Sequence, residues 1–362
     1  MEIRKEINEL LIDLKRIRRK LHMIPEIGFN TKNTMKLIKQ LVSINPIEDD
    51  GISGVFYFKS SEKCIAFRCE LDGLNIVEEN NIEYRSLNNY MHACGHDLHM
   101  AIMILMINYY SNYPHKPSLL FIFQPAEESG AGANYMIEKG LIEKYNVKEL
   151  YAFHVLPNLG DFIGCSNGII MSQSCEIEIN FKGLSGHITS NNSIDSIKTT
   201  NYFLNEFYKL KNEIKPHKIH IGSIQGGTVC NSVAESCTLK GTIRCLEENM
   251  MDFIKECIEN LLYRIDSKFK TKSTIKYSIG YPPLINNIEL VSKIKRLAED
   301  SYIAMEPLLL SEDFSYYGNY CNICYMFCGL TTSNELHSST FDLKEEDCLK
   351  MLELYFRIIE NS

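Results

Sequence analysis

The stretch at residues 91–99, which reads Met-His-Ala-Cys-Gly-His-Asp-Leu-His, constrains this chain more than any other part of the sequence. It brings one thiol and three imidazole groups close together and leads directly into the apolar residues 100–106. In an extended segment, residues i and i+2 point to the same side, so Cys94 and His96 can grip one ion from the end of a strand. Asp97 is expected to cap the helix that the apolar run predicts. The stretch therefore predicts a strand, a turn that carries ligands, and a helix.

Carboxylate and imidazole side chains follow other apolar segments of the chain. Glu127 and Glu128 come just after the predicted strand 118–124, His154 ends another strand, and His337 lies in a polar loop. A single buried Cys or His is usually a core residue, and an acidic pair is often merely exposed, but here such residues recur near strand ends. Adjacent residues of an extended chain point to opposite sides, so one carboxylate could reach a metal while the other faces a substrate. The combination indicates a catalytic metal site.

Predicted strands and helices alternate in the first part of the chain. This order argues for a largely parallel sheet covered by helices, and such sheets bind ligands at the carboxyl ends of their strands. The predicted elements are helices 2–22 and 31–42, strands 54–58 and 64–71 around a turn at 60–63, helix 97–111, strand 118–124, helix 135–139 and strand 149–155.

The pattern then changes to strand, helix, strand, strand, helix, strand, which is the ferredoxin-like order. These elements are expected at 175–182, 194–211, 217–225, 236–246, 250–268 and 273–279. Afterwards the chain returns to the first pattern with helix 287–302, strand 323–328 and helix 344–360. We therefore expect an α/β fold in which 1–172 and 284–362 form a discontinuous catalytic domain and 173–283 form an inserted ferredoxin-like α+β domain.

Composition excludes several classes of function. The 362 residues carry a net charge of −8 and no basic stripe, which argues against a nucleic-acid partner. The N-terminal residues do not resemble a secretory signal, and the apolar runs are too short for a membrane span. Thirteen cysteines without such a signal indicate reduced thiols and a cytoplasmic protein, not a disulfide framework.

The motifs resemble those of a family of metal-dependent amidohydrolases that includes hippurate hydrolase, auxin-conjugate hydrolases and N-acetyl-diaminopimelate deacetylase. The family is related to the aminoacylases and to glutamate carboxypeptidase, and the resemblance runs from Arg19 to Glu346 in the family's order. Besides 91–99, it rests on residues 22–29 (His-Met-Ile-Pro-Glu-Ile-Gly-Phe), 124–128 (Gln-Pro-Ala-Glu-Glu), 152–157 (Ala-Phe-His-Val-Leu-Pro), 311–317 (Ser-Glu-Asp-Phe-Ser-Tyr-Tyr) and 336–342 (Leu-His-Ser-Ser-Thr-Phe-Asp).

The resemblance implies a centre of two divalent metal ions completed by a bridging water. Its expected ligands are Cys94, His96, Glu128, His154 and His337. Imidazole and thiolate ligands suit Zn²⁺ and other first-row ions, so we expect Zn²⁺ or Mn²⁺, with Co²⁺ and Ni²⁺ also compatible.

The resemblance also implies roles for residues that do not bind the metals. Glu127 would be the general base, and Asp72 would orient a ligating histidine from the outer shell. His187 would donate to the oxyanion, while Asn231 and Arg244 would hold the carboxylate of the substrate. The implied reaction is hydrolysis of the amide bond of N-acyl L-amino acids, with N-acetyl-diaminopimelate and hippurate-like compounds as candidate substrates.

His187 lies on the inserted domain, which supplies no predicted metal ligand. Either a hinge closes this domain over its own site, or the protein is a homodimer in which the domain reaches the partner's site. The resemblance favours a homodimer, in which the inserted domain serves for dimerisation or as a lid.

The chain departs from the family pattern at several places. Glu70 stands where the family has Asp, Asn75 stands where it has Pro, and residues 188–192 lack the family's second His. The sequence also leaves two other functions open: a dipeptidase or carboxypeptidase of the same family, and a non-catalytic protein that binds metal or peptide. A base at Glu127 favours an enzyme over a binding protein. The absence of the dipeptidases' His-x-Asp pair at residues 70–72 favours substrates with simple acyl groups over dipeptides.

Overall fold

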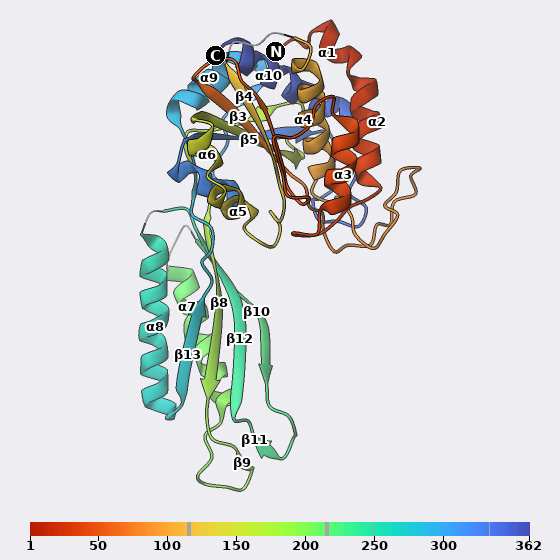
Figure 1. The fold of residues 1–362 in the computed structure, drawn as a ribbon. Helices are drawn as coiled ribbons and strands as arrows, with labels where there is room; N and C mark the ends of the chain where they lie inside the picture. The colour runs from red at the N-terminus through yellow and green to blue at the C-terminus, as the bar shows by residue number, and fades with distance from the viewer. Residues whose placement is uncertain (114–116, 214–216, 248, 333) are drawn as a thin grey trace. The chain divides into compact units, whose positions relative to one another are not determined.

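The computed structural model describes residues 1–113, 117–213, 217–247, 249–332 and 334–362 (Figure 1). The chain forms two compact units. The first unit consists of Met1–Ile170, Ile285–Glu306 and Asp313–Ser362, and the second consists of Met171–Leu284 and Pro307–Glu312. Most of the second unit is thus inserted into the chain of the first.

The first unit contains the strands of a large sheet, two short strands that pair only with each other, and the helices packed around them. Up to the insertion these are α1 (Lys5–Glu9), α2 (Leu11–His22), α3 (Lys32–Leu41), β1 (Glu48–Asp49), β2 (Gly54–Phe58), β3 (Cys64–Glu70), α4 (His96–Tyr110), β4 (Ser118–Gln124), α5 (Gly132–Glu138), α6 (Leu141–Lys144), β5 (Val147–Pro157), β6 (Ile163–Gly164) and β7 (Gly168–Met171). After it follow β14 (Leu284–Asn286), α9 (Ile288–Ala298), η1 (Glu299–Ser301), β15 (Tyr302–Ile303), η2 (Asp313–Asn319), β16 (Asn322–Leu330), η3 (Glu345–Cys348) and α10 (Leu349–Glu360), of which η1 to η3 are 3₁₀ helices.

The large sheet has the strand order β1-β2-β4-β3-β5-β16-β6-β15. Its centre, β4-β3-β5-β16, is parallel, whereas β2 pairs with β4 in the antiparallel sense. The predicted helix-covered, mostly parallel sheet is confirmed. The consecutive strands β2 and β3 are not neighbours, because β4 lies between them.

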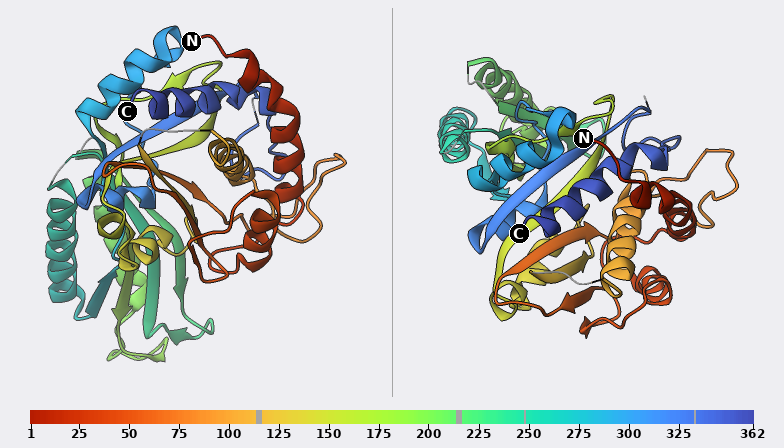
Figure 2. Two further views of the ribbon diagram at one scale, coloured as in Figure 1. Left: turned by 45° about the horizontal axis from the view of Figure 1, so that its top comes forward. Right: turned by 90° about the horizontal axis from the view of Figure 1, so that it is seen from above.

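Helices cover both faces of this sheet (Figures 1 and 2). All seven residues of β3 and all seven of β4 are buried, which is typical of a parallel strand enclosed from both sides. On one face, apolar residues of α2, α4, α9 and α10 form a single core with alternate residues of these strands, such as Ile65, Phe67 and Phe121. The core fixes the carboxyl ends of β3, β4 and β5 side by side.

The second unit is built on a four-stranded antiparallel sheet with the order β10-β12-β8-β13. Two helices lie in its chain between these strands, and their apolar residues share one core with the sheet. This is the predicted ferredoxin-like order. The elements are β8 (Gln173–Lys182), β9 (Gly186–His187), α7 (Ser196–Glu213), β10 (His217–Gly226), β11 (Ser232–Val233), β12 (Ser236–Cys245), α8 (Met250–Phe269) and β13 (Lys272–Tyr277).

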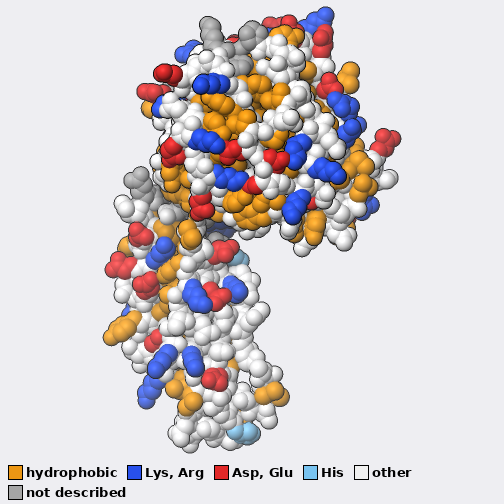
Figure 3. All heavy atoms as spheres, in the orientation of Figure 1, with side chains coloured by type: hydrophobic (Ala, Val, Ile, Leu, Met, Phe, Trp, Pro, Cys, Tyr) orange, Lys and Arg blue, Asp and Glu red, His pale blue; other side chains and the backbone are white. Residues whose placement is uncertain are grey.

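The surface carries charges of both signs. On the face seen in Figure 3, acidic and basic side chains are interspersed over each unit. Among the helices that the structure describes, none has the length and apolar content needed to cross a membrane.

Candidate metal centre

Cys94 lies in a short turn between an isolated bridge at Met91 and the start of α4. The turn depends on Gly95, whose φ is +84°, and a Cβ at this position would lie 2.5 Å from Cγ2 of Val155. A side chain at residue 95 would therefore clash with Val155, and glycine is needed for this turn. The ligand pair is not strand-like, however, because α4 already begins at His96. Cys94 and His96 come together through the left-handed glycine turn and not through an extended segment.

Asp97 does not cap α4, so that prediction was wrong. The helix begins after Gly95 without a side-chain cap, and the Asp97 carboxylate instead lies 2.8 Å from both Arg18 Nε and His22 Nδ1. Asp97 is fully buried, and burying a carboxylate is costly unless charged groups pair with it. Pairing with Arg18 and His22 therefore takes precedence over capping the helix. The Arg18 guanidinium and the His22 imidazole keep the pKa of Asp97 well below its usual value, although burial alone would raise it.

His96 is oriented for an ion. Its Nδ1 lies 2.7 Å from the main-chain oxygen of Asp72, which can only accept, so the Nδ1 proton is donated there. Its Nε2 is buried and has no hydrogen-bond partner in the described part of the chain. A buried imidazole nitrogen that keeps its lone pair and lacks a donor is what a metal ligand requires.

Asp72 acts on the neighbouring segment as well. Its two carboxylate oxygens accept the main-chain N–H groups of Glu127 and Glu128, each at 3.1 Å, whereas its Oδ1 lies 3.9 Å from His96 Nδ1. The histidine is thus held by the main chain of Asp72, and the carboxylate holds the acidic pair. Burial and the nearby Glu128 charge raise the pKa of Asp72 to about 6.

Two further expected ligands meet at Cys94, and a third lies beside one of them. Its Sγ lies 3.2 Å from Nε2 of His154, on β5, and 3.3 Å from Nε2 of His337. His154 Nδ1 donates to the main-chain oxygen of Val155 at 2.7 Å, which leaves Nε2 with its lone pair toward Cys94. His337 Nε2 also lies 3.5 Å from Oε1 of Glu128.

The ligand atoms form two groups that share one residue. In the first, atoms of Cys94, His96 and His154 lie within 4.8 Å of one another, and in the second those of Cys94, Glu128 and His337 do. Soft thiolate, imidazole and carboxylate donors are a typical set for a first-row divalent ion. The structure therefore brings together all five residues that the sequence analysis named as ligands, and their arrangement fits two adjacent ions.

The electrostatics of the cluster also favour a cation. Burial, together with the Glu128 and Glu127 charges, raises the pKa of the Cys94 thiol well above its usual value. Burial lowers the pKa of His154 to about 3, so its imidazole is neutral. Glu128 is partly buried, which would raise its pKa, but its contacts with His337 and His96 bring that pKa down to about 2. A bound cation would offset the cost of forming the thiolate beside two carboxylates.

Glu127 and Glu128 belong to a turn and not to an extended strand end. Oxygens of both carboxylates lie within 4.8 Å of a ring nitrogen of His96. The opposite orientation that an extended chain would impose therefore does not apply, and both side chains face the ligand cluster. Glu127 is buried there as well.

The sequence analysis missed a buried network behind the ligands. Glu70 is bonded to Arg68, and its Oε2 lies 2.8 Å from Nδ1 of His99, whose Nε2 accepts the main-chain N–H of Val155 at 3.3 Å. Both ring nitrogens of His99 are thus occupied, which distinguishes it from His96. Arg68 Nη2 also lies 2.6 Å from Oδ1 of Asp313. The i, i+2 spacing of Arg68 and Glu70 in a strand was the signal that could have revealed this pair.

The three expected substrate-contacting residues lie in the second unit. His187 is exposed on β9, and its Nδ1 lies 2.8 Å from Oγ1 of Thr189. Asn231 is also exposed, and its main-chain oxygen accepts from Ile188. Arg244 is partly buried on β12 and donates to the main-chain oxygen of Leu309 at 2.9 Å. Within their own unit, no shared cluster of the described residues joins these three side chains as the ligands are joined at Cys94.

Comparison with known proteins decides the family. Residues 66–361 match the model described as Peptidase family M20/M25/M40. The chain belongs to this family. It is accordingly a hydrolase, and its relatives include amide-bond hydrolases. N-acetyldiaminopimelate deacetylase of Shouchella clausii is 31% identical over 92% of this chain and 94% of the relative, and that of Bacillus velezensis is 30% identical over 91% and 93%.

Solved structures of similar proteins share the fold. A dinuclear metal binding peptidase of the M20 family from Bacillus subtilis is 25% identical and superposes with a TM-score of 0.85, covering 98% of this chain and 99% of that one. A protein from methicillin-resistant Staphylococcus aureus superposes with a TM-score of 0.90 at 23% identity, covering 98% and 97%. The resemblance to the amidohydrolase family inferred from sequence motifs is confirmed.

Proposed function

We propose that this chain hydrolyses the amide bond of N-acyl L-amino acids at a centre of two divalent metal ions. The observation that carries the proposal is the position of Cys94, whose Sγ belongs to both groups of ligand atoms. His96 and His154 would complete one site, and Glu128 and His337 the other. The dinuclear metal binding peptidase from Bacillus subtilis supports the number of ions. Zn²⁺ and Mn²⁺ are the ions we favour.

Glu127 is the proposed general base. When bound, the ions would polarise the scissile carbonyl and lower the pKa of the attacking water. Glu127 would take the proton of that water and pass it to the leaving amine. The Asp72 carboxylate contributes by fixing the main chain at Glu127 and Glu128, so that base and ligand keep their separation. His187 would donate to the oxyanion, and Asn231 and Arg244 would hold the substrate carboxylate.

N-acetyl-diaminopimelate is the first substrate to test. Two relatives that carry this activity in their names match more than nine tenths of this chain. Glu70 stands where a dipeptidase of the family would be expected to carry the histidine of a His-x-Asp pair, and its carboxylate is occupied by Arg68 and His99. The cytoplasm, where thiols such as those of this chain stay reduced, is the compartment we propose.

A release assay tests the proposal. Metal-depleted protein and protein restored with Zn²⁺ or Mn²⁺ are incubated with N-acetyl-diaminopimelate, hippurate, other N-acyl amino acids and dipeptides. We expect release of the free amino acid from one or more N-acyl compounds by the restored protein alone. Cleavage of dipeptides only, or equal activity without metal, would contradict the proposal.

A further inference from the structure

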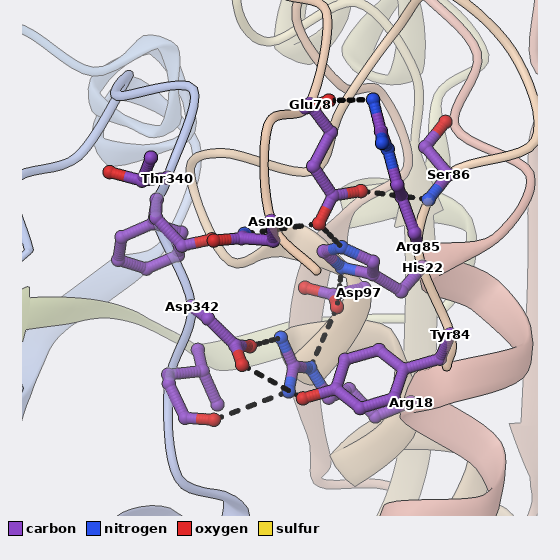
Figure 4. A network of polar contacts seen from close by, with 12 residues as sticks. Arg18, His22, Glu78, Asn80, Tyr84, Arg85, Ser86, Asp97, Thr340 and Asp342 are labelled. Atoms are coloured by element: carbon purple, nitrogen blue, oxygen red, sulfur yellow. Dashed lines mark hydrogen bonds and ion pairs between the residues drawn. The ribbon is translucent and has the colours of Figure 1, made fainter. Parts of the chain in front are cut away.

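Arg18 lies on α2, far from the proposed ligands in sequence, and its side chain is completely buried. Its guanidinium group contacts three carboxylates, of which those of Asp97 and Asp342 are labelled in Figure 4. Nε lies 2.8 Å from Oδ2 of Asp97, Nη2 lies 2.7 Å from Oδ1 of Asp342, and Nη1 lies 3.3 Å from Oε1 of Glu345. Nη1 also donates to the main-chain oxygen of Leu343 at 3.3 Å.

Two of these partners belong to the segments that carry proposed ligands. Asp97 directly follows His96, and Asp342 lies shortly after His337. A single side chain therefore ties the start of α4 to the loop of His337. The two segments also meet directly, because the main-chain N–H of His337 donates to the oxygen of Ala93 at 2.9 Å.

His337 depends on such support more than the other histidines do. Its φ is +63°, a conformation that L-residues rarely adopt, and its side chain is 52% exposed. His154 is instead fixed by a central strand, and His96 by the start of α4. Asp342 in this loop is held by a second residue as well, because the Tyr84 hydroxyl donates to its Oδ2 at 2.8 Å.

We infer that Arg18 is a positioning residue for one of the two metal sites, the one formed by Cys94, Glu128 and His337. By holding Asp97 and Asp342 at once, it sets the separation of Cys94 and His337, whose ligand atoms lie 3.3 Å apart. The planar fork of arginine can hold several carboxylates in fixed directions, which the single ammonium group of lysine cannot do. The inference rests on the proposed two-metal function.

The test is a Zn²⁺ titration of metal-depleted protein by calorimetry with a competing chelator. The variants are Arg18→Lys, which keeps the charge, and Asp342→Asn, which alters a side chain that is 26% exposed and therefore spares the core. Wild-type protein is expected to bind two ions. In both variants we expect one site to keep its affinity and the other to weaken about 10–100-fold, the usual effect of losing an outer-shell partner. Activity lost at limiting Zn²⁺ should return at excess Zn²⁺.

Arg4→Met is the matched control. Arg4 Nε lies 3.0 Å from Oε1 of the fully buried Glu353, so this variant also takes an arginine away from a buried carboxylate, but Arg4 contacts neither ligand segment in the described structure. It should bind two ions with wild-type affinities. Equal weakening of both sites in the Arg18 and Asp342 variants, unchanged affinities, or the same one-site loss in Arg4→Met would overturn the inference. Fewer than two ions on wild-type protein would instead refute the proposed centre itself, and the inference with it.

Discussion

The proposed ligand cluster and the proposed substrate contacts differ in how they are held. Cys94, His96 and His154 are buried in the first unit, and the second ring nitrogen of each of these two histidines is bonded to a main-chain oxygen. His187 and Asn231 are exposed on the second unit and have few polar contacts. The first region is arranged before any substrate arrives. In the second region, we expect the substrate itself to provide much of the ordering.

Removal of the metal ions should have the largest effect and should act on the first region only. We expect activity to be abolished, because the carbonyl would no longer be polarised. Ions present at a thousandfold excess over their dissociation constant stabilise a protein by about 4 kcal/mol, so residues 91–99 and 334–342 should exchange their amide hydrogens faster after removal. Hydrogen exchange followed by mass spectrometry measures this. Equal acceleration in β8 and β12 would show that the two regions do not differ.

Substitution of Glu127 and of Glu128 should have different effects, because we expect Glu127 to be the base and Glu128 a metal ligand. We expect Glu127→Gln to lower kcat by about 10²–10⁴-fold, since proton transfer would be lost, while two ions stay bound. Glu128→Gln is the matched variant and should lose one ion. Steady-state kinetics and metal analysis of the same samples check both expectations. If the Glu127→Gln variant kept near wild-type turnover, Glu127 would not be the general base.

His187→Ala should reduce kcat by about 10²–10³-fold without changing stability or metal content, because an exposed side chain is lost. His220→Ala, another exposed histidine of the second unit, is the control. Mixing His187→Ala with Glu127→Gln under subunit exchange distinguishes the two geometries. Recovered activity indicates that His187 acts on the partner's site in a homodimer. No recovery, with exchange shown independently, indicates closure within one chain or no role in catalysis.

The buried network at His22 should make the stability of the first region depend on pH. Burial would lower the pKa of His22, but Asp97 and Glu78 raise it from 6.5 to about 9. The imidazolium therefore stabilises the fold fully below about pH 6.5, and this contribution is lost as the pH rises through about 9. It amounts to about 3 kcal/mol. Arg18, Tyr84 and His92 also face this ring.

Urea unfolding of wild-type protein and of His22→Gln at several pH values measures this loss. The difference in unfolding free energy between the two proteins should shrink from pH 6.5 to pH 9. His220→Gln should follow wild type throughout. Parallel curves for wild type and His22→Gln would contradict the assignment.

The sequence predicted the fold from local patterns, whereas the five proposed ligands came from its resemblance to the amidohydrolase family. Strand ends of a parallel sheet meet at one edge, so Glu128 and His154 could be placed near Cys94 without knowing the tertiary structure. The long-range ion pairs could not be predicted. Asp97 was expected to cap α4, yet Arg18, 79 residues earlier, binds it instead. In the sequence, Glu70 is only a departure from the family pattern. In the structure, its carboxylate is bonded to Arg68 and His99. Apart from the i, i+2 spacing of Arg68 and Glu70, the order of residues along the chain carries no signal of these partners.

The most direct test of the central claim is a crystal structure of Zn²⁺-loaded protein with anomalous diffraction data at the zinc edge. We predict two anomalous peaks about 3.5–4 Å apart, with Cys94 Sγ in contact with both ions. His96 and His154 should bind one ion, and Glu128 and His337 the other. A single peak, or two peaks of which neither touches Cys94, would contradict the account.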